Sequence, residues 1–229
     1  MNSMKFPKAV FFDLDGTILD TEKLYLKLML EYNKGKKMSI SKKFYINNFL
    51  GKSKKEISII MKDYFGEKYD EDTYWEGLLE YRENYINNHK IIIKKGFNEL
   101  IDFLKLKNCY IGLVTSNSME LLKLLLKKAD VNINIFDSIV CRENVKRVKP
   151  YPDLYEFAIK KSGLNTNDIV ALEDSNVGII SALEANINVI YIKDISNVDK
   201  KLQKKCIVCC NSMNNVMNFY NSGGSYGNN

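Results

Sequence analysis

Short apolar runs alternate with longer amphipathic segments along most of the chain. Each run is rich in aromatic or branched residues and stops at a polar or glycine turn, which is typical of a buried strand. The runs predict strands near Val10–Phe12, Tyr110–Thr115, Ser138–Cys141, Ile169–Leu172 and Asn188–Ile192, with an edge strand over Cys206–Cys210. The segments between them predict helices near Phe97–Lys107, Ser118–Lys128, Pro152–Ser162 and Ser175–Ala185. This alternation predicts an α/β fold built on a parallel sheet.

A long helical stretch, about residues 22–94, interrupts the alternation soon after the first strand. Apolar residues recur at helical spacing in Glu22–Tyr32, after a capping box at Ser53–Glu56, and again from Trp75 to Ile86. Several amphipathic helices joined by short loops predict a bundle. We therefore expect a core of residues 1–21 and 95–229 and a helical cap of residues 22–94 that lies above the core as a lid. Ser222–Ser225 and the residues after it predict a frayed tail.

Two aspartates, Asp13 and Asp15, follow the first apolar run and precede a glycine turn. Two carboxylates this close are costly to hold unless their charge is used. Mg²⁺ prefers hard oxygen ligands and bridges them to phosphate. An aspartate can also attack phosphorus to form an aspartyl-phosphate, while a second one protonates the leaving oxygen. The same sequence occurs in ordinary polar turns, so the segment alone leaves both interpretations open.

Three further polar clusters follow later strands or precede later helices. Thr115-Ser116-Asn117 offers a hydroxyl and backbone N–H groups, Lys149 lies in a loop stiffened by two prolines, and Glu173-Asp174 is a second acidic pair. Each has an ordinary alternative: a helix cap, a solvated lysine, or a loop. In open α/β sheets, however, ligands bind outside the carboxyl ends of the strands. Four such clusters in this order predict a single phosphate-binding site.

This set of motifs resembles the haloacid dehalogenase-like superfamily of phosphotransferases. The resemblance covers about residues 8 to 193. The phrases DLDGTILDTE, KPYPD and LEDSNVGI are most similar to the β-phosphoglucomutase-like branch, and Asp20–Tyr25 is similar to its pseudouridine-5'-phosphatase group. That branch includes small phosphatases acting on sugar phosphates, glycerol phosphate and pseudouridine 5'-phosphate. The resemblance implies a Rossmann-like parallel sheet with a helical cap inserted after the first motif.

The resemblance also implies roles for individual residues. Asp13 matches the nucleophile, Asp15 the general acid and base, and Lys149 the lysine that neutralises charge. Thr115 matches the hydroxyl that binds phosphate, with the backbone N–H groups of Ser116-Asn117 beside it. We therefore expect these residues to bind and transfer one phosphoryl group.

A Mg²⁺ site is implied by the same match. Asp13, Asp174 and the backbone carbonyl of Asp15 correspond to its ligands, and Glu173 to a neighbour that reaches the metal through water. Mg²⁺ is the one cofactor that we expect.

The cap turn Leu50–Lys55 has two interpretations. Its three lysines lie at a helix start, where the helix dipole disfavours cations, and they form either a solvated turn or the substrate-specificity loop that the family places here. In the second case Gly51 lets the backbone approach the ligand, and Lys52 binds it. Tyr25 is another candidate for contacting the substrate. A histidine stands at its place in the sugar-phosphate mutase, so Tyr25 disfavours a mutase.

We expect a Mg²⁺-dependent phosphatase that hydrolyses a small phosphomonoester of a sugar, polyol or nucleoside. A β-phosphoglucomutase-like phosphomutase is the alternative, because it would use the same core and return the phosphoryl group to a sugar. A dehalogenase needs no metal and is disfavoured by Asp15 and the second acidic pair. A non-catalytic binding module is disfavoured because every core motif residue is present.

Composition and charge exclude several other classes of protein and partner. The chain has 229 residues, 45% of them hydrophobic, which suffices for a packed core. Its net charge of +6 comes from dispersed lysines without a basic block, so we expect no nucleic-acid partner. The five cysteines are an odd, scattered set, and the single histidine disfavours a His-based triad or zinc site. The chain shows neither a signal segment nor a run of membrane length. We expect a cytoplasmic monomer without a membrane partner.

Overall fold

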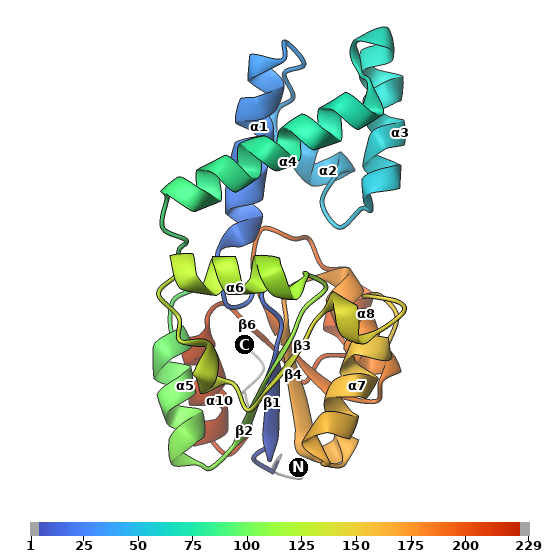
Figure 1. Ribbon diagram of the computed structural model, residues 1–229. Coiled ribbons are helices and arrows are strands. Elements are labelled where there is room, and N and C mark those ends of the chain that lie inside the picture. Colours follow the sequence, from blue (N-terminus) through green and yellow to red (C-terminus); the bar gives the residue numbers. More distant parts are fainter. Residues whose placement is uncertain (1–4, 225–229) are drawn as a thin grey trace.

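The computed structural model describes residues 5–224, and its centre is a six-stranded parallel sheet (Figure 1). The strand order is β3-β2-β1-β4-β5-β6, so β1 pairs with β2 on one side and with β4 on the other. The strands are β1 (Ala9–Phe12), β2 (Tyr110–Val114), β3 (Ser138–Val140), β4 (Ile169–Glu173), β5 (Asn188–Ile192) and β6 (Val208–Cys210). The predicted Rossmann-like α/β fold is confirmed.

Helices cover both faces of the sheet (Figure 1). On one face lie α5 (Phe97–Leu106), α6 (Met119–Lys128) and α10 (Met213–Asn221), and on the other lie α7 (Asp153–Ser162) and α8 (Asn176–Glu184). Val10 and Phe12 pack against the first layer, and Ala9 and Phe11 against the second. Because successive side chains of a strand point to opposite faces, a strand covered on both faces reads as a continuous apolar run.

Four helices form a separate group beyond the sheet, α1 (Thr21–Gly35), α2 (Lys42–Asn48), α3 (Lys54–Phe65) and α4 (Glu71–Asn88), drawn at the top of Figure 1. They bury a hydrophobic cluster of their own: Leu26, Met29, Tyr32, Met38, Tyr45, Phe49, Met61, Tyr69 and Tyr74. The predicted capping box at Ser53–Glu56 is present at the start of α3. This group is the insertion that we predict to act as a cap.

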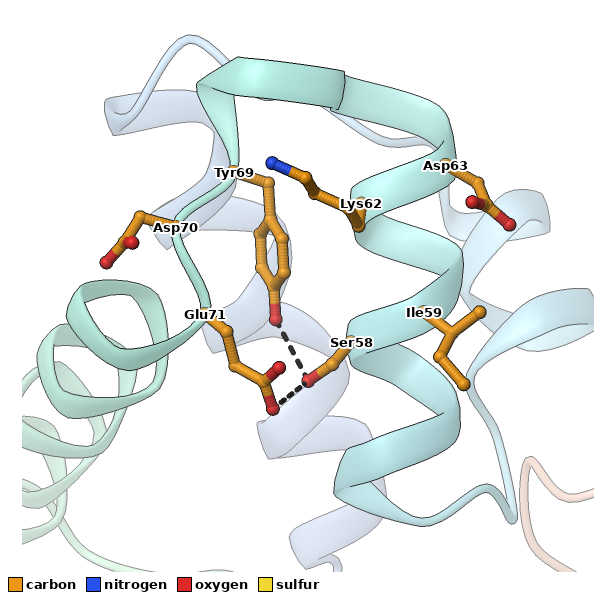
Figure 2. Close-up of a pocket in the computed structure, with 7 residues that line it drawn as sticks. All are labelled: Ser58, Ile59, Lys62, Asp63, Tyr69, Asp70 and Glu71. Carbon is orange, nitrogen blue, oxygen red and sulfur yellow. Dashed lines mark hydrogen bonds between the residues drawn. The ribbon is translucent and has the colours of Figure 1, made fainter.

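A buried serine ties α3 to the start of α4 (Figure 2). Ser58 is 4% exposed, and its hydroxyl donates to Glu71 Oε1 at 2.8 Å. Tyr69 Oη donates to Ser58 Oγ at 3.0 Å, and Trp75 Nε1 donates to the same atom at 2.8 Å. Buried polar groups that satisfy one another in this way favour a single arrangement of the elements they join.

The chain passes between the core and the helical group twice, and the two passages pair with each other. Residues 18–20 run antiparallel to residues 92–94, joined by two backbone hydrogen bonds of 2.8 and 2.9 Å. Lys94 Nζ lies 2.6 Å from Asp194 Oδ1, which anchors the second passage to the loop after β5. Asp20 precedes α1, and its side chain accepts no capping hydrogen bond from the described residues.

The structure also differs from the prediction in three helices and at the C-terminus. Sequence reasoning missed α2, α10 and the short α9 (Lys200–Gln203). Residues of the predicted frayed tail close α10, because Gly224 N–H donates to the Phe219 carbonyl at 3.0 Å, whereas residues 225–229 lie outside the described part of the chain. Short 3₁₀ turns occur at Gly66–Lys68, Ile133–Ile135, Arg142–Asn144 and Thr166–Asp168. Every helix within residues 5–224 is too short or too polar to cross a bilayer.

Candidate active site

The carboxyl ends of β1, β2 and β4 lie side by side, and the predicted polar clusters meet there. Lys149, from the loop before α7, reaches between them with a side chain that is only 4% exposed. Its Nζ lies 2.5 Å from Asp13 Oδ1 and 2.6 Å from Glu173 Oε1, and it also donates to the Val114 carbonyl at 2.9 Å. A single buried ammonium group therefore joins the ends of all three strands.

The acidic residues at this edge form a site that fits a divalent cation. Asp13, Glu173 and Asp174 are all buried, and each offers one oxygen within 4.8 Å of the others. Glu173 Oε2 and Asp174 Oδ2 are buried and have no hydrogen-bond partner among residues 5–224. A Cβ atom at Gly16, which has φ +75°, would lie 2.1 Å from Asp174 Oδ2, so this position requires glycine. Hard oxygen donors left unpaired in a closed site suit Mg²⁺.

The electrostatics of the cluster favour a bound cation. Burial, followed by the charges of Asp13 and Glu173, raises the pKa of Asp174 well above its usual range. Burial also raises the pKa of Glu173 to about 7, against the opposing charge of Lys149. Burial alone would lower the pKa of Lys149, but the carboxylates of Asp13 and Glu173 raise it. A bound cation would stabilise the charged form of every one of these carboxylates.

Asp15 is held by two donors. Thr21 Oγ1 donates to Asp15 Oδ1 at 2.6 Å, and Asn117 Nδ2 donates to Asp15 Oδ2 at 2.6 Å. Burial and then the charge of Asp13 raise the pKa of Asp15, while these hydrogen bonds oppose the rise. A raised pKa favours the protonated form of the carboxyl group, which is the form that a general acid needs. Sequence reasoning missed Thr21, because the hydrogen bond depends on how α1 leaves the strand end.

The Thr115-Ser116-Asn117 cluster also lies at the strand ends and forms hydrogen bonds of its own. Thr115 is 1% exposed, and its Oγ1 accepts a hydrogen bond from Asn117 N–H at 3.1 Å. The Asn117 N–H group, which we expect to bind phosphate, donates within the cluster here, and the Asn117 side chain contacts Asp15. A threonine hydroxyl that accepts a hydrogen bond can still donate its own proton. The carbonyl of Ser116 accepts a hydrogen bond from Arg142 Nε at 3.1 Å.

A second residue that the sequence did not reveal is Tyr155 on α7. It is fully buried, and its hydroxyl donates to Glu173 Oε1 at 2.5 Å. Lys149 Nζ lies 5.1 Å from the centre of its ring. Tyr155 thus helps fix both the carboxylate and the ammonium group. Its helical spacing with Leu154 and Ala158 signals burial but not this contact.

A family model for haloacid dehalogenase-like hydrolases matches residues 10–192 of the chain. This segment holds every residue of the strand-end site. The chain belongs to the haloacid dehalogenase-like hydrolase family.

Individual relatives within the family are distant. The phosphorylated carbohydrates phosphatase of Thermotoga maritima is 25% identical over 186 residues, which are 80% of this chain and 84% of that protein. Protein SUPPRESSOR OF QUENCHING 1 of Arabidopsis thaliana is 26% identical over 81% of this chain, which spans 18% of that protein's length. A solved haloacid dehalogenase-like protein of unknown function from Agrobacterium tumefaciens has a TM-score of 0.83 at 18% identity, covering 96% of this chain and 100% of that one. That likeness shows the shared fold.

Above the site of this hydrolase, a cavity of about 740 Å³ separates the strand ends from the helical group. Lys149 and Pro150 line it from the core, and Tyr25, Gly51 and Lys52 line it from α1 and the turn before α3. Both Gly51 and Lys52 are exposed. Gly51 has φ +74° with open space where a Cβ would stand, so its backbone conformation, and not crowding, explains the glycine. The structure thus brings the predicted cap residues to the cavity that opens onto Lys149.

Proposed function

We propose that this hydrolase is a Mg²⁺-dependent phosphatase that cleaves a small phosphomonoester through an aspartyl-phosphate on Asp13. The observation that carries the proposal is that Asp13 contacts Lys149 and belongs to a buried acidic cluster in which two oxygens have no partner within residues 5–224. A cation on one side and a metal site on the other would both attract phosphate oxygens. The similarity to a phosphorylated carbohydrates phosphatase supports the same reaction class.

Four residues would hold the metal in this proposal. Asp13 and Asp174 would bind it through their carboxylates, Asp15 through its backbone carbonyl, and Glu173 through water. When bound, Mg²⁺ supplies positive charge that neutralises the phosphoryl oxygens and draws them toward the carboxylates. Tyr155 would act through Glu173 as a positioning residue.

The protein's own groups perform the two displacements. A carboxylate oxygen of Asp13 attacks phosphorus, and the bond from phosphorus to the leaving oxygen breaks. Asp15 gives its proton to that oxygen, so an alcohol departs. Asp15 then takes a proton from water as the water oxygen attacks phosphorus, which releases phosphate and restores Asp13. Lys149 and the Thr115 hydroxyl bind the phosphoryl oxygens throughout and stabilise the charge of the transition state.

The test is phosphate release from a panel of sugar, polyol and nucleoside monophosphates, measured with Mg²⁺ and with excess chelator. We expect turnover that needs Mg²⁺ and is lost in Asp13→Asn, which keeps the shape of the side chain and removes the nucleophile. Circular dichroism checks that the variant is folded. Full activity in chelator, or in Asp13→Asn, would overturn the proposal. Isomerised sugar phosphate without free phosphate would identify a mutase instead.

A further inference from the structure

The cavity below α1–α4 opens onto the strand-end site through Lys149, which lines it and contacts Asp13. With a phosphoryl group at Asp13, the rest of the substrate would extend into this cavity. Much of the cavity wall is apolar or aromatic: Leu28, Tyr45, Phe49, Trp75 and Leu78. A polar group on that wall therefore decides which leaving groups are bound well.

Arg82 on α4 is such a group. It lines the cavity, and its guanidinium carbon lies 5.0 Å from the centre of the Tyr25 ring. Its Nε is buried and has no hydrogen-bond partner within residues 5–224. In the same part of the chain no carboxylate forms an ion pair with Arg82. A half-buried guanidinium group that rests on an aromatic ring, lines a cavity and has no ion-pair partner in the described part of the chain can bind an anion that enters the cavity.

The two acidic residues of the cavity do not bind Arg82. Glu56 Oε2 accepts hydrogen bonds from the backbone N–H and the hydroxyl of Ser53, at 2.8 and 2.7 Å. Within residues 5–224, Glu22 forms no hydrogen bond or ion pair with Arg82. The cavity lining holds four cationic side chains against these two acids, so its charge is positive: Lys52, Lys54, Arg82 and Lys149.

The charge of Arg82 acts on Asp15. Burial and the charge of Asp13 raise the pKa of Asp15, and the charge of Arg82 is among the effects that lower it. Arg82 thus lies within electrostatic reach of the group that protonates the leaving oxygen. In the proposed reaction Lys149 binds the transferred phosphoryl group. Arg82 is therefore available to bind the other end of the substrate.

We propose that Arg82, resting on Tyr25, selects phosphomonoesters whose leaving group carries a second anionic group, either a carboxylate or a phosphate. The guanidinium fork binds either anion through paired hydrogen bonds. This inference rests on the proposed phosphatase function and adds a substrate class to it.

Two substrate pairs test the selection. Glycerol 3-phosphate and 3-phosphoglycerate differ by a carboxylate, and fructose 1-phosphate and fructose 1,6-bisphosphate differ by a phosphate, so the pairs also distinguish the two anions. We expect the wild type to prefer the anionic member of at least one pair in kcat/KM. Arg82→Gln should reduce that preference about 10- to 100-fold, the range for a lost hydrogen bond to a charged group. Arg82→Lys should keep part of it.

Two controls separate recognition from folding. Lys62→Gln removes the same charge from the helical group at an exposed side chain outside the cavity, and should leave the preference unchanged. In an Asp13→Asn background, calorimetry with Mg²⁺ present should show weaker binding of the anionic member when Arg82 is also replaced.

The outcomes are distinct for the two proposals. Equal losses for both members of each pair, or a wild type without preference, would overturn the role of Arg82 while the phosphatase stands. Failure to hydrolyse any phosphomonoester, and acetyl phosphate as well, would overturn the proposed phosphatase function.

Discussion

The strand-end site and the cavity wall above it are built in opposite ways. At the strand ends Thr115, Glu173 and Asp174 are at most 2% exposed, and Lys149 and Asp15 are each held by two or more partners. On the wall, Lys52 is exposed and Arg82 is half-buried, with no ion pair to any residue in the described part of the chain. A buried network fixes one geometry, whereas groups with spare donors can accept different ligands. The difference suggests that the strand ends perform the chemistry and the cap chooses the substrate.

Replacing Lys149 should break the strand-end site most severely. Lys149→Met leaves a group of buried carboxylates without its cation, so phosphatase activity should vanish and the free energy of unfolding should fall by about 3–5 kcal/mol. Urea unfolding without divalent cations measures the loss. Lys146→Met, an exposed position in the same loop, is the control and should change little. A fully stable Lys149→Met protein would show that the buried network is not the constraint we describe.

Replacing Asp15, the proposed general acid, should lower phosphatase activity less than replacing Lys149. Asp15→Asn should lower turnover of alkyl phosphates about 10²–10⁴-fold, the usual contribution of a general acid. An activated aryl phosphate, whose leaving group needs little protonation, should lose less in the first step. Hydrolysis of the aspartyl-phosphate would then limit turnover. Equal, small losses on both substrate types would contradict the role of Asp15.

Glu22 lies at the border of the two regions and should make stability depend on pH. Its pKa is raised from 4.5 to about 8 in the folded protein, mainly by burial, so the folded state holds a proton that the unfolded chain has released. Its contribution to stability is fully present below pH 4.5 and is lost as the pH rises through about 8. In chelator, Glu22→Gln should flatten the fall in urea midpoint over this window. Parallel profiles for wild type and variant would refute the shift.

The smallest effect should come from the cap turn. Lys52→Ala should change the ranking among phosphorylated sugars, polyols and nucleosides by a few-fold to about tenfold, the range for one lost hydrogen bond. Acetyl phosphate, which fills only the phosphate pocket, should be affected least. Lys55→Ala, on the same helix start but outside the cavity lining, is the matched control. A uniform loss on every substrate would assign Lys52 to cap closure.

The contrast between the strand-end site and the cavity wall also explains which parts of the structure the sequence predicts. Strand ends were predictable because an apolar run covered on both faces stops where polar residues begin, as Phe12 gives way to Asp13. The helix α10 was missed because Met213, Val216 and Phe219 are its main apolar positions among several asparagines. Short α2 offers barely two turns, too little for a periodic pattern.

Contacts between distant segments left no sequence signal. Arg82 and Tyr25 meet only because α4 packs beside α1, and the hydroxyl of Tyr155 reaches Glu173 only once α7 covers the sheet. Neither pairing follows from spacing along the chain. The residues that perform the proposed chemistry were therefore predictable, whereas those that position them or contact the rest of the substrate required the fold.

The most direct test of the account is to trap the phosphoryl group on the protein. Asp15→Asn, incubated with Mg²⁺ and an activated aryl phosphate and then quenched in acid, should yield a phosphorylated peptide that contains Asp13. Hydroxylamine should remove the label, as expected for an acyl phosphate, and Asp13→Asn/Asp15→Asn should show none. Steady turnover with no trapped phosphoryl group, or with the label on another residue, would contradict the assignment of Asp13 as the nucleophile.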